Sequence, residues 1–309
     1  MKLFITGATG VLGEPVTRQL IEKGYTVKAL SRSENNRLRL TEWGATPVNA
    51  TLFKAESLAS ALSDCEAVLH LATKIPRVAD MKKPGAWTEN DRIRRDGMRA
   101  IVTAASQVPS VHTIIYPSVS FLYADSGDRW IDSENASLDV AAPMKSTLDA
   151  EADVAAFAGS RPERRGVVLR FGSFYGPGSA DSRQALDLAR KGLTIGLARR
   201  DAYRSMIWIA DAASAIVHAL ENAPSGLFDV VEAEPFTQAR STQALAQAVG
   251  RRSLFVAPKW LLRFLLPGDM RRLLARSQRV SNRRFCEETG WNPSVPSQQE
   301  GWALMCSQP

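Results

Sequence analysis

The sequence predicts an α/β fold, in which helices cover both faces of a doubly wound parallel sheet and a smaller C-terminal lobe completes the molecule. Two observations predict it. Short apolar runs alternate with stretches of helical periodicity along most of the chain, and its 309 residues are about twice the usual domain length of roughly 150 residues. Strands that are separated by helices pair in parallel, because a parallel connection needs a long crossover.

The first elements form a recognisable unit. Apolar runs cover residues 2–6 and 26–30, and the helical stretch between them ends at Lys23-Gly24, a typical helix stop. This order predicts a strand, a helix and a second strand at the start of the chain. Further strands are expected at residues 67–71, 113–116, 166–171 and 226–231, and helices at residues 92–106 and 148–158.

The regular alternation weakens after Phe171, where the chain becomes richer in Gly, Pro and Arg. We therefore expect residues 1–172 plus 206–231 to form the main domain. Residues 173–205 plus 232–309 are expected to form the smaller lobe, over the carboxyl ends of the strands, where open α/β sheets bind their ligands.

The charge of the chain is concentrated near its C-terminal end. The net charge is 39 − 32 = +7, and residues 251–309 contribute +6 of it, with ten Lys and Arg against four Asp and Glu. Its arginine stripe, residues 271–284, has no interleaved aromatics, and no DNA-binding motif is recognisable. We expect a solvated basic face and no nucleic-acid partner, with contact to an anionic substrate or a cofactor phosphate as the alternative.

Membrane and metal sites are not expected. The most apolar stretch, residues 260–266, is interrupted by Arg263 and is far shorter than the roughly 20 residues that span a bilayer. The N-terminal apolar run is too short for a signal peptide. Three cysteines and three histidines without metal-ligand spacing indicate a reducing compartment and no metal. We expect a cytoplasmic protein.

A glycine-rich turn, Gly7-Ala8-Thr9-Gly10-Val11-Leu12-Gly13, follows the first strand and leads directly into the first helix. One glycine allows the tight turn, a second lets the backbone approach a pyrophosphate, and Gly13 lets helix and strand pack closely. Free N–H groups at the start of the helix attract the phosphates. The turn therefore predicts a dinucleotide site of the Rossmann type. The expected cofactor-binding residues of this turn are Gly7, Thr9, Gly10, Val11, Leu12 and Gly13.

The end of the second strand distinguishes the two nicotinamide cofactors. An acidic residue there binds the ribose 2′-hydroxyl of NAD, whereas an Arg pairs with the 2′-phosphate of NADP. The chain reads Leu30-Ser31-Arg32-Ser33, with no acid before Glu34. Ser31 and Arg32 therefore predict NADP. In the alternative, Arg32 stacks on the adenine and NAD is the cofactor.

The chain resembles the extended short-chain dehydrogenase/reductase superfamily, which includes nucleotide-sugar epimerases and dehydratases. The resemblance covers nearly the whole chain and implies a Rossmann-type fold with a nicotinamide cofactor beside Leu71 and Ala72. Besides the glycine turn, the matching segments are His70-Leu71-Ala72, Leu122-Tyr123-Ala124-Asp125, residues 170–178 (RFGSFYGPG) and residues 204–212 (RSMIWIADA).

The catalytic residues of that superfamily are replaced. Its members use a Tyr followed four residues later by a Lys, with a Glu four residues beyond. The ammonium lowers the pKa of the phenol, which then exchanges a proton with the substrate. Alignment on Glu151 places Thr147 at the Lys and Pro143 at the Tyr. The family's Ser or Thr falls on Val119 and its helical Asn on Arg94, so the chain resembles the atypical members.

Other side chains are candidates for the missing roles. The candidate catalytic residues are Ser118, Ser120, Tyr123 and Arg94. The hydroxyls can exchange a proton, whereas the guanidinium of Arg94 binds a carboxylate or stabilises an oxyanion without a usable proton. In the alternative, Arg94 pairs with Asp96 or Glu89 on the surface.

The substrate site is expected in the smaller lobe. The candidate substrate-binding residues are Phe174, Tyr175, Arg204 and Trp208, and their types suggest a small, partly apolar molecule. The favoured function is an NADP(H)-dependent oxidoreductase on a small carbonyl substrate. The alternatives are a non-redox isomerase, lyase or cyclase, and a protein that binds NADP(H) without turnover, because the fold alone does not separate them. The sequence leaves a homodimer open.

Overall fold

The computed structural model describes residues 1–257, 260, 264 and 266–307. Its centre is a seven-stranded sheet in the order β12-β7-β5-β4-β1-β2-β3, with every neighbouring pair parallel. The predicted α/β class is therefore confirmed. The strands are β1 (Lys2–Thr6), β2 (Thr26–Leu30), β3 (Thr46–Val48), β4 (Ala67–His70), β5 (Thr113–Val119), β7 (Arg165–Phe171) and β12 (Gly226–Val230).

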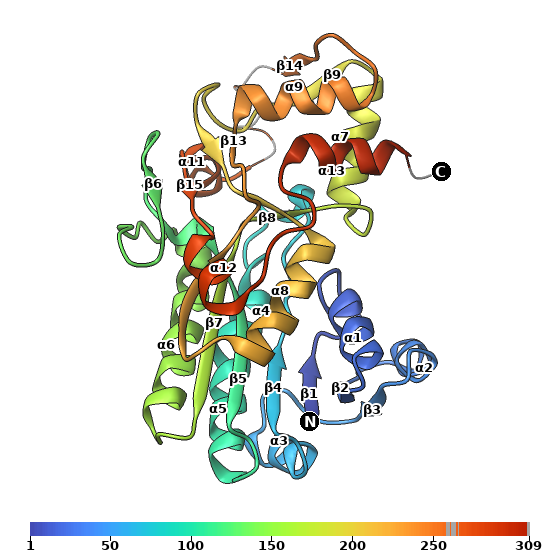
Figure 1. Cartoon of the computed structure of the whole chain (residues 1–309), viewed down its shortest axis with the longest axis vertical. Coiled ribbons are helices and arrows are strands. Elements are labelled where there is room, and N and C mark those ends of the chain that lie inside the picture. Colours follow the sequence, from blue (N-terminus) through green and yellow to red (C-terminus); the bar gives the residue numbers. More distant parts are fainter. Residues whose placement is uncertain (258–259, 261–263, 265, 308–309) are drawn as a thin grey trace.

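Helices cover both faces of the sheet (Figure 1). The alternating side chains of β1 separate two cores, because Leu3 and Ile5 pack in one cluster and Phe4 in the other. The first core lies under α1 (Gly13–Glu22) and α8 (Ile209–Asn222), and the second under α3 (Ala55–Leu62), α5 (Met98–Gln107) and α6 (Lys145–Gly159). The other elements of this half are α2 (Glu34–Glu42), η1 (Val78–Asp80), α4 (Thr88–Arg92), η2 (Ile93–Gly97), η3 (Ser120–Leu122), β6 (Trp130–Ile131) and η4 (Ala142–Met144).

The connection between β3 and β4 reverses the direction in which strands are added. The chain runs from β1 outward to β2 and β3, then returns to place β4 on the other side of β1. Ligands of open α/β sheets bind at such a switch point, beyond the carboxyl ends of the strands. The turn after β1 lies at this point.

The C-terminal part of the chain forms a layer beyond the carboxyl ends of the strands (Figure 1). Its core combines Tyr175, Trp208, Phe236, Leu245 and Trp302. The remaining elements are β8 (Ser173–Tyr175), α7 (Ala180–Arg190), β9 (Leu193–Ile195), β10 (Tyr203–Arg204), β11 (Met206–Trp208), β13 (Phe236–Thr237), α9 (Gln238–Ala248), β14 (Phe255–Ala257), α11 (Gly268–Ala275), β15 (Arg279–Val280), α12 (Arg283–Thr289) and α13 (Gln298–Ser307).

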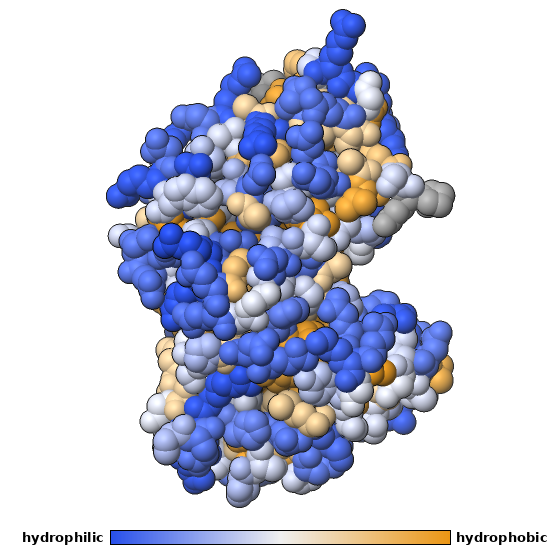
Figure 2. Space-filling view, viewed as in Figure 1, coloured by the Kyte–Doolittle hydropathy of each residue, from blue (hydrophilic) through white to orange (hydrophobic). Residues whose placement is uncertain are grey.

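One part of residues 232–309 packs away from this layer. Phe285 on α12 and the following Trp291 belong to the first core of the sheet, with ring centroids 5.4 Å apart. The surface view shows a notch between the two halves of the molecule (Figure 2). Among the helices that the structure describes, none combines the length and apolarity needed to cross a membrane.

A buried carboxylate, Asp229 on β12, ties the edge of the sheet to the loop after β5. The Tyr123 hydroxyl donates to its Oδ1 at 2.7 Å, and the Ser133 backbone N–H donates to its Oδ2 at 2.7 Å. Burial raises the pKa of Asp229 to about 7, although the Tyr123 hydrogen bond and the charge of Arg170 oppose the shift. The folded chain therefore keeps a proton on Asp229 that an unfolded chain has already lost.

This carboxyl predicts that the free energy of unfolding falls as the pH rises from 3.8 toward about 7, because the folded state binds more protons than the unfolded state in that range. One group contributes at most about 1.4 kcal/mol per pH unit. Asp229→Asn removes this contribution, so urea denaturation between pH 5 and 7 should show a flatter dependence. Glu232, whose pKa burial raises to about 8, retains part of the slope.

Asp128→Asn, at an exposed position, is the matched control and should keep the slope of the wild type. Equal slopes in wild type and Asp229→Asn would contradict the assignment of this proton to Asp229.

Candidate functional site

The glycine turn packs tightly against the end of β4. Gly7 has φ +76°, and a Cβ there would lie 2.6 Å from the Cα of Ala72. A Cβ on Gly13 would lie 2.0 Å from the carbonyl oxygen of Gly7. At Gly10 the nearest atom to an added Cβ is the same oxygen, at 3.2 Å. Gly7 and Gly13 are therefore required by packing inside the protein, whereas Gly10 lies on the exposed side of the turn.

The start of α1 offers backbone donors to a ligand. The residue before the helix, Leu12, has no side chain that caps it. The Glu14 N–H donates to the Gly10 carbonyl at 2.9 Å, whereas the N–H groups of Leu12 and Gly13 make no hydrogen bond to a described residue and remain available to a phosphate. Leu12 anchors the turn in the core, whereas the Val11 side chain is 51% exposed beside Gly10. Thr9 is half-buried. This cradle fits the pyrophosphate of a dinucleotide.

The sequence placed Ser31 and Arg32 at the adenosine end of this site. Ser31 is buried at the end of β2, and its hydroxyl donates to the carbonyl of Ser33 at 3.1 Å. Arg32 is exposed and makes no hydrogen bond or ion pair with any residue that the structure describes. The next helix begins at Glu34, which pairs with Arg37 at 3.1 Å. Arg32 thus projects from the strand end with its guanidinium unengaged.

Three side chains on β5, α6 and β7 form a buried ionic cluster. Arg170 donates to both carboxylate oxygens of Glu151, at 2.9 and 2.6 Å, and the Ser118 hydroxyl donates to the same carboxylate. Thr147, one helical turn before Glu151, is buried, and Pro143 lies in η4. The Ser118 hydroxyl, a candidate catalytic group, is therefore occupied by a structural contact to Glu151.

The other two hydroxyl candidates have different surroundings. Tyr123 is fully buried, its phenol donates to Asp229, and the Arg170 guanidinium lies 4.9 Å from its ring centroid. Burial and the neighbouring Asp229 raise the pKa of Tyr123 far above its usual value. Ser120, in η3, is 2% exposed, and its hydroxyl makes no hydrogen bond within the described ranges. Ser120 is thus the candidate hydroxyl that no protein group occupies.

Arg94 lies in a π-helical turn, η2, between α4 and α5, and such turns occur frequently at functional sites. The guanidinium is 5% exposed and donates from Nη1 to the Tyr116 hydroxyl at 2.8 Å. The alternative of a surface ion pair is wrong, because Asp96 pairs with Arg95 instead, at 3.1 Å, and Arg94 is buried.

His70 fixes this turn to the sheet. Its Nε2 lies 3.1 Å from the Ile93 carbonyl and its Nδ1 lies 2.6 Å from the Thr6 hydroxyl. A carbonyl only accepts, so Nε2 carries the proton and Nδ1 accepts from Thr6. Burial lowers the pKa of His70 to about 4, which keeps the ring neutral. Arg94 is therefore held next to the ends of β1 and β4.

Two of the expected substrate residues pack inside the C-terminal layer. Tyr175 and Trp208 are buried with ring centroids 5.3 Å apart. The Tyr175 hydroxyl donates to Glu232 at 3.3 Å and lies 3.1 Å from the Ser297 carbonyl. Phe174 is half-buried against Phe171. These aromatic side chains support the lobe from within.

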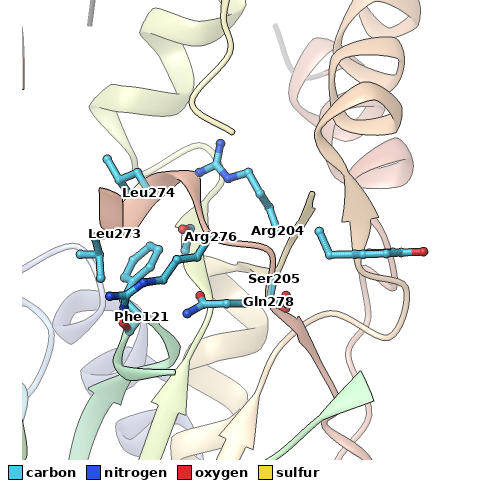
Figure 3. Close-up of a pocket in the computed structure, with 9 residues that line it drawn as sticks. Phe121, Arg204, Ser205, Leu273, Leu274, Arg276 and Gln278 are labelled. Carbon is cyan, nitrogen blue, oxygen red and sulfur yellow. Dashed lines mark hydrogen bonds between the residues drawn. The ribbon is translucent and has the colours of Figure 1, made fainter. Parts of the chain in front are cut away.

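Arg204 faces a small hollow at the carboxyl edge of the sheet (Figure 3). It is half-buried and makes no hydrogen bond or ion pair inside the described part of the chain. Burial lowers its pKa. Arg276, which reaches toward Phe121 in Figure 3, is engaged by Asp139 and by the Tyr123 carbonyl. The hollow is lined by Phe121, Ser173, Tyr203, Arg204, Ser205, Leu273, Leu274, Arg276 and Gln278.

Most lining residues of this hollow were not expected from the sequence. They come from the segments after β5 and β7, from β10, and from α11 with the residues that follow it. One sequence feature pointed to this hollow, namely the excess of basic residues in 251–309, because Arg276 is one of them. Two apolar side chains of α11, Leu273 and Leu274, line the hollow together with Arg204. The described residues contain no group of His, Cys, Asp or Glu able to hold a metal ion.

Comparisons with known proteins agree with this geometry. A 3-diazoavenalumate denitrifying reductase from a Streptomyces species is 29% identical over 97% of this chain and 99% of its own length. A photosystem II assembly factor, Ycf39, from a Synechocystis strain is 41% identical, over 24% of this chain and 22% of its own.

Solved structures share the fold over the whole length. The human epimerase family protein SDR39U1 (isoform 2), determined with NADPH, superposes with a TM-score of 0.83 at 22% identity, covering 100% of both chains. The UDP-glucose 4-epimerase of Thermus thermophilus, in complex with NAD, has a TM-score of 0.77 at 20% identity, covering 99% of this chain and 98% of its own.

The family assignment rests on the first three quarters of the chain. The profile of the NAD dependent epimerase/dehydratase family matches residues 3–230, from β1 to the end of β12. This segment contains the glycine turn, the switch point between β1 and β4, and the Glu151 cluster. The expected nicotinamide cofactor, NADP with NAD as the alternative, is in line with this match. The chain belongs to the NAD dependent epimerase/dehydratase family.

Proposed function

We propose that the chain is an NADP(H)-dependent oxidoreductase that acts on a small, partly apolar carbonyl compound. The observation that carries the proposal is the glycine cradle at the switch point together with the unengaged Arg32 at the end of β2. An arginine at that strand end recognises the 2′-phosphate of NADP. When bound, the cofactor supplies hydride chemistry, and the protein positions the reacting carbon.

The replaced catalytic pair favours a reductase over an epimerase. Sugar epimerisation needs a positioned group that removes and returns a proton, and Thr147 and Pro143 offer no such group. Reduction of a carbonyl needs one hydride, which the cofactor supplies, and one proton, which ordered water can supply. Ser120 is the hydroxyl we assign to orient the substrate oxygen, directly or through water, because its own hydroxyl has no partner among the described residues. The full-length similarity to a reductase supports this choice.

The hollow at Arg204 gives the proposed substrate two contrasting ends. The guanidinium of Arg204 suits an oxygen-rich, negatively charged group, and Leu273, Leu274 and Phe121 suit an apolar body. A small organic acid with a reducible group meets both requirements. The alternative is non-redox isomerase, lyase or cyclase chemistry on the same fold. Measuring NADPH consumption together with product mass separates the two.

Arg32→Ala should weaken NADPH binding about 10- to 100-fold, because charge-assisted hydrogen bonds to the 2′-phosphate contribute roughly 1.5–3 kcal/mol. NADH binding should change little, since NADH lacks this phosphate. Calorimetric titration of both cofactors measures the two affinities. Arg37→Ala is the matched control, because Arg37 is also exposed on the same segment but pairs with Glu34. Equal losses for NADPH and NADH would remove the argument for NADP.

A panel of small aldehydes, ketones and oxo acids, followed by NADPH absorbance and by product mass, tests the reaction class. Reduction with NADPH consumption is expected, and Ser120→Ala should lower kcat by about 10²- to 10⁴-fold. Thr147→Ala should keep kcat within a few-fold. Product formation without NADPH consumption would favour the non-redox alternative, and a large defect in Thr147→Ala would contradict the assignment of residue 147 as a bystander.

A further inference from the structure

Arg94 is a buried cation that the protein only partly satisfies. Of its five N–H donors, one makes a hydrogen bond to a residue in the described parts of the chain, the Nη1 contact to the Tyr116 hydroxyl at 2.8 Å. No carboxylate of the described residues lies within ion-pairing distance of it. The other buried guanidinium of this region, Arg170, is bidentate to Glu151. Burial of an unpaired charge is costly, so this position calls for a function.

The surroundings of Arg94 leave its charge uncompensated. Glu151, the carboxylate whose charge acts on Tyr116, is already engaged by Arg170 and Ser118. His70 is neutral and holds the π-helical turn through the Ile93 carbonyl. Thr147, which lies beside Tyr116, brings no charge. A net positive charge therefore remains fixed at this point of the site.

The location of this charge relates it to the cofactor. Ile93, the neighbour of Arg94, is tied to His70, the last residue of β4, and the next two residues, Leu71 and Ala72, contact the glycine turn. The charge thus lies at the edge where the dinucleotide of the proposed function binds. The two redox forms of that cofactor differ in one property that a fixed charge detects, because the oxidised nicotinamide ring is cationic and the reduced ring is neutral.

We infer that Arg94 makes the protein select the reduced cofactor, an inference that rests on the proposed NADP(H) site. The positive charge of Arg94 repels the cationic ring of NADP⁺ and tolerates the neutral ring of NADPH. The remainder of the cofactor, including the 2′-phosphate that Arg32 meets, is identical in both forms, so its contributions cancel in the ratio of their affinities. A fixed cation that favours NADPH suits a reductase, which must load the reduced form in the presence of the oxidised one.

Calorimetric Kd values for NADPH and NADP⁺, without substrate, test the inference. The wild type should bind NADPH about tenfold more tightly than NADP⁺, a difference of about 1.4 kcal/mol. Arg94→Met should bring the ratio close to one, mainly by tightening NADP⁺. Arg94→Lys should keep the preference. In the Arg94→Met/Thr147→Lys double variant, a cation returns from the facing helix, and the preference should return with it.

Two further variants separate charge from structure. Tyr116→Phe removes the hydrogen bond of Arg94 but keeps the cation, so the ratio should stay at the wild-type value even if both affinities weaken. Arg94→Gln keeps donors without charge, and it replaces Arg94→Met in the comparison if that variant does not fold by circular dichroism. A purely structural role of Arg94 would change both affinities equally.

The outcomes are distinguishable. A wild-type ratio near one, or an unchanged ratio in folded Arg94→Met or Arg94→Gln, overturns the inference while leaving the proposed cofactor site intact. Failure of the wild type to bind either NADPH or NADP⁺ overturns the proposed function, and the inference with it.

Discussion

The contact between the glycine turn after β1 and the end of β4 determines where the rest of the site lies. Gly7 and Gly13 leave no room for a side chain, so the turn, the start of α1 and the residues after β4 form one closely packed unit. His70 joins the π-helical turn to the same unit through hydrogen bonds on both ring nitrogens. Arg94 is thereby positioned by the same packing that shapes the cradle for a phosphate.

A second constraint holds together the region around Glu151. The bidentate pair of Arg170 and Glu151 joins β7 to α6, and Ser118 adds β5 to the same carboxylate. Breaking such a buried pair costs about 3–5 kcal/mol. The pair therefore holds α6 on the sheet independently of the residue type at position 147.

The sequence predicted the features that depend on local chemistry. The glycine turn and the strand–helix–strand unit at the start of the chain could be predicted because each is defined by neighbouring residues. The short edge strand β3 was missed because it is Thr46-Pro47-Val48, and Pro is tolerated only where one side of a strand is unpaired. The helix expected over residues 92–106 is interrupted, since the π-helical turn depends on the distant His70.

Long-range partners decide the roles that the sequence left open. Tyr123 has the right residue type for proton transfer, but its partner Asp229 lies 106 positions away, and the pair is structural. Tyr175 and Trp208 have the right type for a ligand wall, yet Trp302 and Glu232 enclose Tyr175.

Arg94 and Arg204 behave in the opposite way, because the burial of Arg94 and the partial burial of Arg204 are combined with a shortage of acceptors among the described residues. A folded protein normally pairs its buried cations. Their position at one edge of the sheet, Arg94 near the glycine turn and Arg204 in the hollow that α11 lines, supports the proposal that this edge binds an anionic ligand.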